Sequence, residues 1–339
     1  MSGTRARVNP EPTVGDLWPP LVNLTPSEVI APATWQALAP LVPALPGPVV
    51  GFERPVNDPR PGEWGFPLPR WQRTAALAID HPNASHVAPL VRAWMDHPGL
   101  DALCDVQGHS WDIVNGISAT PCVFLRVDPR GDWKSMVRGY ASALRNQGHV
   151  TADLTWSDVA DRLEETAATT PIRHVSSIGV YLGRPNCPIR LTVRASLRPH
   201  ADHPAWAHVD EVVAAAEWKA EQVIVAFAPG ADPGDTWHVP LLVDRRPRPS
   251  EALASLLAAL VDRGLATTND ALVLASFDVR CPLPLTFPTL DGVPATATLW
   301  VAPERIKVVV DSTGWRSAKV DFLARVIWRS MTGRVLVDH

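Results

Sequence analysis

The chain has 339 residues, enough for about two ordinary domains, and 46% of them are hydrophobic, which supplies a sizeable core. A net charge of −4 and a pI near 6.3 disfavour bulk affinity for nucleic acid. The sequence contains no run of about 18 apolar residues, so no membrane span is predicted. The first 15 residues lack the apolar segment of a secretory signal. We therefore expect a cytoplasmic protein with no nucleic-acid partner and no membrane partner.

The first 80 residues are interrupted by proline, which fixes φ and removes a backbone donor, so long strands are not expected there. Thr25-Pro26-Ser27-Glu28 has the order of a helix start, with a cap, a proline and an acidic residue. A second short helix is expected around residues 35–41. Residues 1–80 are thus predicted to be a Pro-rich N-terminal arm, anchored to the body by Trp18, Trp35, Trp64 and Trp71.

The remainder of the chain contains an apparent internal repeat. HVAPLVRAWMDH, HVDEVVAAAEWKA and KVDFLARVIWRSM share helical apolar spacing, and the segments 123–148 and 240–264 both predict a strand followed by a helix that stops at glycine. SIGVYLGRPNCPIRLTVRA and TATLWVAPERIKVVVDS both predict a strand, a proline-containing turn and a second strand. Each unit therefore has the order helix, hairpin, one or two helices, hairpin.

The predicted fold class is α+β: two similar helix/β-hairpin units form antiparallel sheets that helices cover on one face. The first unit is expected over residues 81–203. The second is expected over residues 204–339, with a closing helix at 318–330. Open sheet edges would also allow a homodimer.

An arginine row is the most specific local signal in the sequence. In the strand from Ile189, the apolar side chains alternate with Arg190, Arg194 and Arg198, so the arginines should share one outward face. Successive arginines would lie roughly 13 Å apart along a strand, a spacing suited to separate carboxylates or phosphates. The alternative is a solvated face whose arginines pair with acidic residues across the sheet.

Two other segments carry chemistry-bearing residues. HADHPAWAHVDE brings several histidines and aspartates together and could hold a metal, although such residues are also common where a helix begins. Cys187 lies in a turn between Arg184 and Arg190, which would lower a thiol pKa, but no base accompanies it, and a structural thiol is favoured.

Neither a cofactor nor a metal is predicted. The spacing of Cys104, Cys122, Cys187 and Cys281 matches no zinc module, and reduced thiols are expected. The chain lacks GxGxxG after a strand, GxxxxGK[ST] and GxSxG, which are the fingerprints of nucleotide sites and of the nucleophile elbow.

SIGVYLGRPNCPIRLTVRA and the stretch SWDIVNGISATPCVFLRVD resemble accessory peptide-binding proteins of ribosomal-peptide natural-product clusters, of the crocagin type. The resemblance implies a protein that holds an extended precursor peptide for modifying enzymes and performs no chemistry itself. Added to the arginine row, it makes the precursor peptide the expected partner, added as a strand to a free edge of this hairpin's second strand, with modifying enzymes as further partners. The predicted peptide-binding residues are Arg184, Arg190, Arg194, Arg198, Trp111 and Tyr181.

Two other functions stay open at this point. One is a cofactor-independent peptide-tailoring enzyme, a cyclase or isomerase, which would need a buried acid/base pair that the sequence does not reveal. The other is a structural partner in a biosynthetic complex. A non-enzymatic role is favoured over catalysis.

Overall fold

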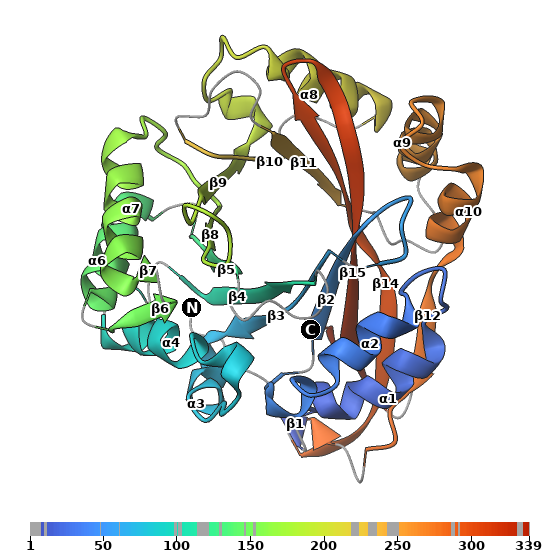
Figure 1. Cartoon of the computed structure of the whole chain (residues 1–339). Helices are drawn as coiled ribbons and strands as arrows, with labels where there is room; N and C mark the ends of the chain where they lie inside the picture. Colours follow the sequence, from blue (N-terminus) through green and yellow to red (C-terminus); the bar gives the residue numbers. More distant parts are fainter. Residues whose placement is uncertain are drawn as a thin grey trace.

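A closed antiparallel β-barrel ringed by helices dominates the computed structural model (Figure 1). The structure describes residues 8–9, 12–47, 49–60, 62–97, 100, 104–113, 122–128, 131–145, 147–151, 154–217, 224–229, 236–242, 251–285, 289–290, 292–330 and 335–338. Within these residues no helix is long and apolar enough to cross a bilayer.

Ten described strands form the barrel, each antiparallel to both of its neighbours, and the pairing of β14 with β15 closes the ring. In order around the ring they are β14 (Val293–Asp311), β11 (Trp237–Leu242), β10 (Ile224–Phe227), β9 (Ile189–Arg194), β8 (Ser177–Tyr181), β5 (Cys122–Arg126), β4 (Val106–Asp112), β3 (Glu63–Pro69), β2 (Val49–Pro55) and β15 (Gly314–Ser330). β12 (Val279–Pro282), β13 (Thr289–Leu290), β1 (Val8–Asn9) and β16 (Val335–Asp338) extend the long β14–β15 ribbon.

Helices surround the barrel, as Figure 1 shows. They are α1 (Val14–Leu24), α2 (Pro32–Leu38), α3 (Arg73–Ala76), α4 (Val87–Asp96), α6 (Trp133–Leu144), α7 (Trp156–Thr169), α8 (Ala205–Ala215), α9 (Glu251–Asp262) and α10 (Thr268–Ser276). Capping boxes at Thr13, Thr155 and Thr267 begin α1, α7 and α10 by satisfying free backbone donors. A small hairpin of β6 (His149–Thr151) and β7 (Leu154–Thr155) precedes α7.

The strands alternate strictly between two environments. In β2 and β3, every second side chain is buried, among them Phe52 and Trp64, and these join the apolar core between the barrel and the helices. The intervening side chains, such as Glu53 and Glu63, face the barrel interior. Because side chains along a strand alternate with period two, the outer face of the barrel wall packs against the helices in an apolar layer, here called the shell. The inner face lines a polar cavity, here called the lumen.

The predicted order of elements is followed only in outline. From α4 the chain runs helix, hairpin, helix, the small hairpin β6–β7, helix and hairpin through β9. From α8 it runs helix, hairpin, two helices, the short strands β12 and β13, and the β14–β15 pair. The mixed architecture of helices on antiparallel strands is confirmed, but the two separate sheets are replaced by one barrel whose strands come from all three predicted ranges.

Two details of the repeat prediction are wrong. The segment 318–330 is no helix but part of β15, and its apolar residues alternate between Val320, Phe322, Ala324 and Val326 on the shell side. TATLWVAPERIKVVVDS is not a hairpin but a continuous stretch of β14, in which a bulge between Pro303 and Arg305 absorbs the proline.

The N-terminal predictions need two further corrections. Thr25 ends α1 as its C-cap instead of beginning a helix, and α2 begins at Pro32. Two seven-residue strands, β2 and β3, occur in the proline-rich region, because Pro55 and Pro69 are the last residues of their strands and Pro67 lies beyond the residues of β3 that pair with β2. Trp35 and Trp64 are buried and Trp18 packs on Trp35, whereas Trp71 is half exposed.

Candidate functional site

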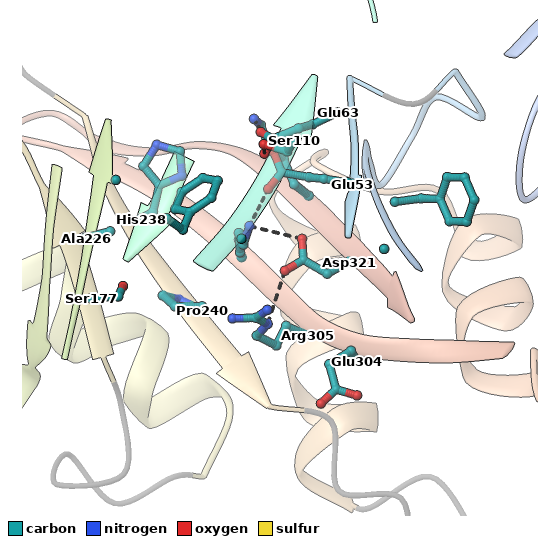
Figure 2. A pocket seen from close by; sticks show the side chains of 18 of the residues that line it. Glu53, Glu63, Ser110, Ser177, Ala226, His238, Pro240, Glu304, Arg305 and Asp321 are labelled. Atoms are coloured by element: carbon teal, nitrogen blue, oxygen red, sulfur yellow. Dashed lines mark hydrogen bonds and ion pairs between the residues drawn. The ribbon is translucent and has the colours of Figure 1, made fainter. Parts of the chain in front are cut away.

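A cavity of about 360 Å³ occupies the barrel interior and is lined by residues from all ten barrel strands. This volume is within the range of small-molecule sites. Figure 2 shows charged side chains converging on it, with Glu53, Glu63 and Asp321 on one side and His238 on another. The lumen is therefore the strongest candidate site among the described residues.

A row of carboxylates crosses four adjacent strands of the lumen wall. Asp321 on β15 lies opposite Glu53 on β2, Glu53 lies opposite Glu63 on β3, and Glu63 lies opposite Asp112 on β4. Directly paired residues share a face, so the four carboxyl groups, here called the acidic row, point the same way. Like charges in direct opposition are destabilising, so the row needs cations to neutralise it.

Two lysines from β14 and β15 neutralise one half of the acidic row. Lys307 hydrogen-bonds Glu53 and lies 3.1 Å from an Asp321 oxygen, and Lys319 Nζ lies 2.7 Å from Glu53 Oε1. Burial alone would raise the pKa of Glu53, but Lys307 and Lys319 hold it well below its ordinary value. Glu53 is thus a fixed anion within the wall.

Glu63 has the opposite character. Burial and the neighbouring Glu53 anion raise the pKa of Glu63 to about 7. Its carboxyl accepts a hydrogen bond from the Ser110 hydroxyl, and Arg184 lies 3.9 Å away. A carboxyl poised near neutrality beside a cavity can accept and release a proton at physiological pH.

Arg190, on the lumen face of β9, has different surroundings from the lysines that pair with the acidic row. Arg190 Nη1 lies 2.9 Å from His238 Nε2 and 3.4 Å from the Tyr181 hydroxyl. Burial and the Arg190 charge lower the pKa of His238 well below its ordinary value, so His238 is neutral and accepts from Arg190. Among the described residues, no carboxylate pairs with Arg190.

Aromatic rings separate Arg190 from the acidic row. The Tyr181 ring carries the guanidinium groups of Arg184 and Arg190, at 4.2 and 4.8 Å from its centroid. Phe124 packs edge-on against Tyr181 at 5.7 Å and also lines the cavity. Arg184 is fixed by Asp112, with N–O distances of 3.0 and 3.2 Å, so its charge is already paired.

The structure separates the six residues that the sequence singled out. Arg184, Arg190 and Tyr181 line the cavity together. Arg194 lies on the same lumen face of β9 as Arg190, exposed at the strand end, and Arg198 lies beyond the strand, where it pairs with Asp210 at 2.6 Å. Trp111 is fully buried in the shell and donates to the Asn83 carbonyl, so it does not line the cavity.

The prediction for β9 was therefore correct about which residues share a face and wrong about where the face with the arginines points. The apolar residues of β9 face the core, as predicted, while the opposite face looks into a closed lumen and not out to solvent. Residues 195–197 form a 3-10 turn, η4 (Ala195–Leu197), which breaks the alternation before Arg198.

Sequence reasoning missed Glu53, Glu63, His238, Lys307 and Lys319. These residues come from β2, β3, β11, β14 and β15, and only the closure of the barrel brings them together. The single local signal was alternation in VVGFERP and GEWGFPLP, where charged or small residues occupy every second position.

The other chemical candidates remain structural. No group of three or more metal-ligating side chains occurs among the described residues, and His203 stacks on Trp237 at 4.5 Å. Burial raises the pKa of Cys187 to about 11, which outweighs the lowering expected from nearby arginines. All four cysteines are free thiols.

No family model and no curated protein sequence matches this chain. Solved structures do resemble it. A 5-dimethylallyltryptophan synthase from Streptomyces coelicolor is 12% identical with a TM-score of 0.48, covering 92% of this chain and 97% of that chain. The prenyltransferase PriB, in a ternary complex with L-tryptophan and dimethylallyl thiolodiphosphate, is 14% identical with a TM-score of 0.49, covering 97% and 99%.

The predicted peptide-binding accessory function is wrong. It required β9 to offer a free edge, but β9 is hydrogen-bonded to β8 on one side and β10 on the other. The lumen face of β9 carries Arg190 into the cavity and not onto an outer face. Closure leaves the barrel strands without open edges, but the sheet still ends at β1, β12 and β16, and the expected homodimer stays a prediction. The crocagin-type resemblance itself stays a prediction.

Proposed function

We propose that this protein is an enzyme that transfers an allylic alkyl group from its diphosphate ester to an aromatic acceptor inside the barrel. The activity is of the class named for the two solved structures above. The observation that carries the proposal is the charge separation of the lumen, with an arginine on β9 that has no carboxylate partner among the described residues and a carboxylate row across β15 to β4.

Arg190 supplies the anion site. A guanidinium binds phosphate oxygens in a bidentate manner, and Arg190 holds neutral partners that a diphosphate can join without displacing a carboxylate. Lys307 and Lys319 lie on β14 and β15 and already pair with Glu53, so they are not part of this anion site. Arg190 stabilises the diphosphate as it leaves.

The remaining groups suit the other half of the reaction. The C–O bond of the ester breaks with its electron pair on oxygen, which leaves an allylic cation beside the Phe124 ring, whose face attracts positive charge. The π electrons of the acceptor form the new C–C bond. The ring proton then passes to Glu63, whose pKa of about 7 suits a general base. No oxidant or reductant is needed.

The proposal is tested by incubating the purified protein with dimethylallyl diphosphate and a panel of indoles and phenols, followed by mass spectrometry. The expected result is an acceptor enlarged by one alkyl group and released diphosphate. Arg190→Gln should lose turnover, whereas Arg198→Gln, which alters an exposed pair outside the lumen, should retain it. Absence of any alkylated product across the panel counts against the function.

We also infer that the two runs of helix, hairpin, two helices, hairpin arose by duplication of one unit. The support is the similar order of the longer elements from α4 to β9 and from α8 to β15, with β6–β7 added in the first run and β12 and β13 in the second. Superposition of the two halves tests this, since duplicated units should align element by element.

A further inference from the structure

Four glycines lie on the lumen wall: Gly51, Gly65, Gly108 and Gly179. Glycine within a strand loses backbone entropy and packing, so each position calls for a physical reason. The usual reasons are a left-handed φ, a close approach of other protein atoms, or a close approach of a ligand.

Neighbouring protein atoms explain three of the four. A Cβ on Gly65 would lie 2.4 Å from the His109 carbonyl oxygen, which no side chain can tolerate. Cβ atoms on Gly108 and Gly179 would lie 3.3 and 3.1 Å from atoms of Phe124, whose side chain packs over both positions. The barrel itself therefore requires Gly65, and side chains at Gly108 and Gly179 would crowd Phe124.

Gly51 has no such explanation. Its φ lies outside the left-handed range, and the atoms nearest to an added Cβ would be main-chain oxygens of Phe322 at 3.7 Å and Gly65 at 4.0 Å. These are ordinary van der Waals distances. The fold would accept a side chain at Gly51, yet the position is bare and faces the cavity.

The geometry points to Gly51 as the platform on which the planar ring of the aromatic acceptor lies, and hence as the residue that limits the acceptor's size. Gly51 pairs directly with Gly65, so two bare backbones form a flat surface, with Leu323 on the far side of Gly51. The inference rests on the proposed function, because it assigns one of the two substrates to this wall.

Charge decides which substrate covers Gly51. Glu53 and Glu63 are the next lumen-facing residues along β2 and β3, directly beside the Gly51–Gly65 pair. Glu53 is already held by Lys307 and Lys319, so Glu63 is the carboxyl there that can accept a hydrogen bond from an N–H or O–H on a ring edge. Arg190, which has no carboxylate partner among the described residues, lies on β9, on the far side of β3, β4, β5 and β8 from Gly51 and so offers the diphosphate a site away from this wall.

The test compares Gly51→Ala and Gly51→Val with Gly62→Val. Gly62 precedes β3 on the same hairpin, its Cβ would also be free, with the Glu53 carbonyl oxygen 3.9 Å away, and it does not line the cavity. Binding of indole, 2-naphthol, phenol and inorganic pyrophosphate is measured by calorimetry, and thermal melting checks the fold. Gly51→Val should weaken the binding of indole and 2-naphthol by about tenfold or more. The binding of phenol should weaken less, and the binding of pyrophosphate should not change.

The outcomes separate this inference from the proposed function. Equal weakening of indole binding by Gly51→Val and Gly62→Val overturns the platform. So does weakened pyrophosphate binding with intact indole binding, which would place the diphosphate on this wall. A wild-type protein that binds pyrophosphate but none of the three aromatics also overturns the platform while the anion site stands. A protein that binds neither class contradicts the proposed function itself.

Discussion

The two faces of the barrel wall bury ionisable groups in opposite ways, and neighbouring residues of β4 show the contrast. His109 faces the shell, packs against His86 and Phe66, and has no hydrogen-bond partner among the described residues for either ring nitrogen. Ser110, the next residue, faces the lumen and donates to Glu63. His109 in the shell is kept neutral by burial alone, whereas Glu53 in the lumen keeps its charge through Lys307 and Lys319.

This difference separates stability from chemistry. The shell gains free energy from apolar contact and tolerates histidine only in its uncharged form. The lumen carries a stability cost, because carboxylates in direct opposition repel one another, and it retains a carboxyl that titrates near neutral pH. Functional sites often carry such a cost. Substitutions on the shell face should therefore change stability, whereas substitutions on the lumen face should change activity as well.

The largest expected effect lies in the shell. Trp111→Ala removes a fully buried indole and leaves the Asn83 carbonyl without its donor, so unfolding free energy should fall by about 3–5 kcal/mol. Urea denaturation measures it. The half-exposed Trp71 provides the control, and Trp71→Ala should cost less than half as much. Equal costs would break the distinction between shell and surface.

Glu63→Gln sharpens the comparison on the lumen side. A carboxyl whose folded-state pKa is raised to about 7 destabilises the fold once pH exceeds its unfolded value and increasingly up to pH 7. Removing the charge should therefore stabilise the protein at pH 8 by up to about 3 kcal/mol and change little at pH 4. Activity should fall, and its rise with pH near 7 should disappear. A variant that is less stable at pH 8 contradicts this account of Glu63.

The shell histidines predict acid sensitivity of the opposite sign. Burial lowers the pKa of His109 to about 3 and, with His109 nearby, that of His86 well below its ordinary value. The unfolded chain takes up protons below about pH 6.5, so stability falls as pH falls. His109→Phe should recover about 2 kcal/mol of this loss at pH 5. Denaturation at pH 5 and pH 8 measures how far the unfolding free energy falls with pH in the wild-type protein and in His109→Phe. An equal fall in the two proteins would refute the conclusion that His109 is buried in its neutral form.

The smallest effect is expected outside both faces. Arg198 pairs with Asp210 at 2.6 Å, but both side chains are close to half exposed. Arg198→Gln should cost less than about 1 kcal/mol and leave pyrophosphate binding unchanged. Weaker pyrophosphate binding by Arg198→Gln would show that Arg198 belongs to the anion site.

The sequence predicted local features well where one element decides them. The β8–β9 hairpin, the helices α4, α6 and α8, and the order of elements follow from periodicity and end signals. Strand β15 was misread, because VDFLARVIW fits helical spacing as well as alternation, and its pairing with β14 and β2 decides the outcome.

The site was only partly predictable for a different reason. Arg184, Arg190 and Tyr181 lie on one hairpin and were found from it. Glu53 and Lys307 are 254 residues apart, and their pairing depends on ring closure, which no local pattern encodes. The same closure turned the expected outer face of β9 into a lumen wall and removed the free edge that peptide binding required.

The central claim is that Arg190 holds a diphosphate in the lumen, and calorimetric titration of inorganic pyrophosphate into the wild-type protein and Arg190→Gln tests it most directly. A charged hydrogen bond contributes about 1.5–3 kcal/mol, so the variant should bind pyrophosphate about tenfold to a hundredfold more weakly, with an unchanged melting temperature. Equal affinity of the two proteins for pyrophosphate would contradict the account.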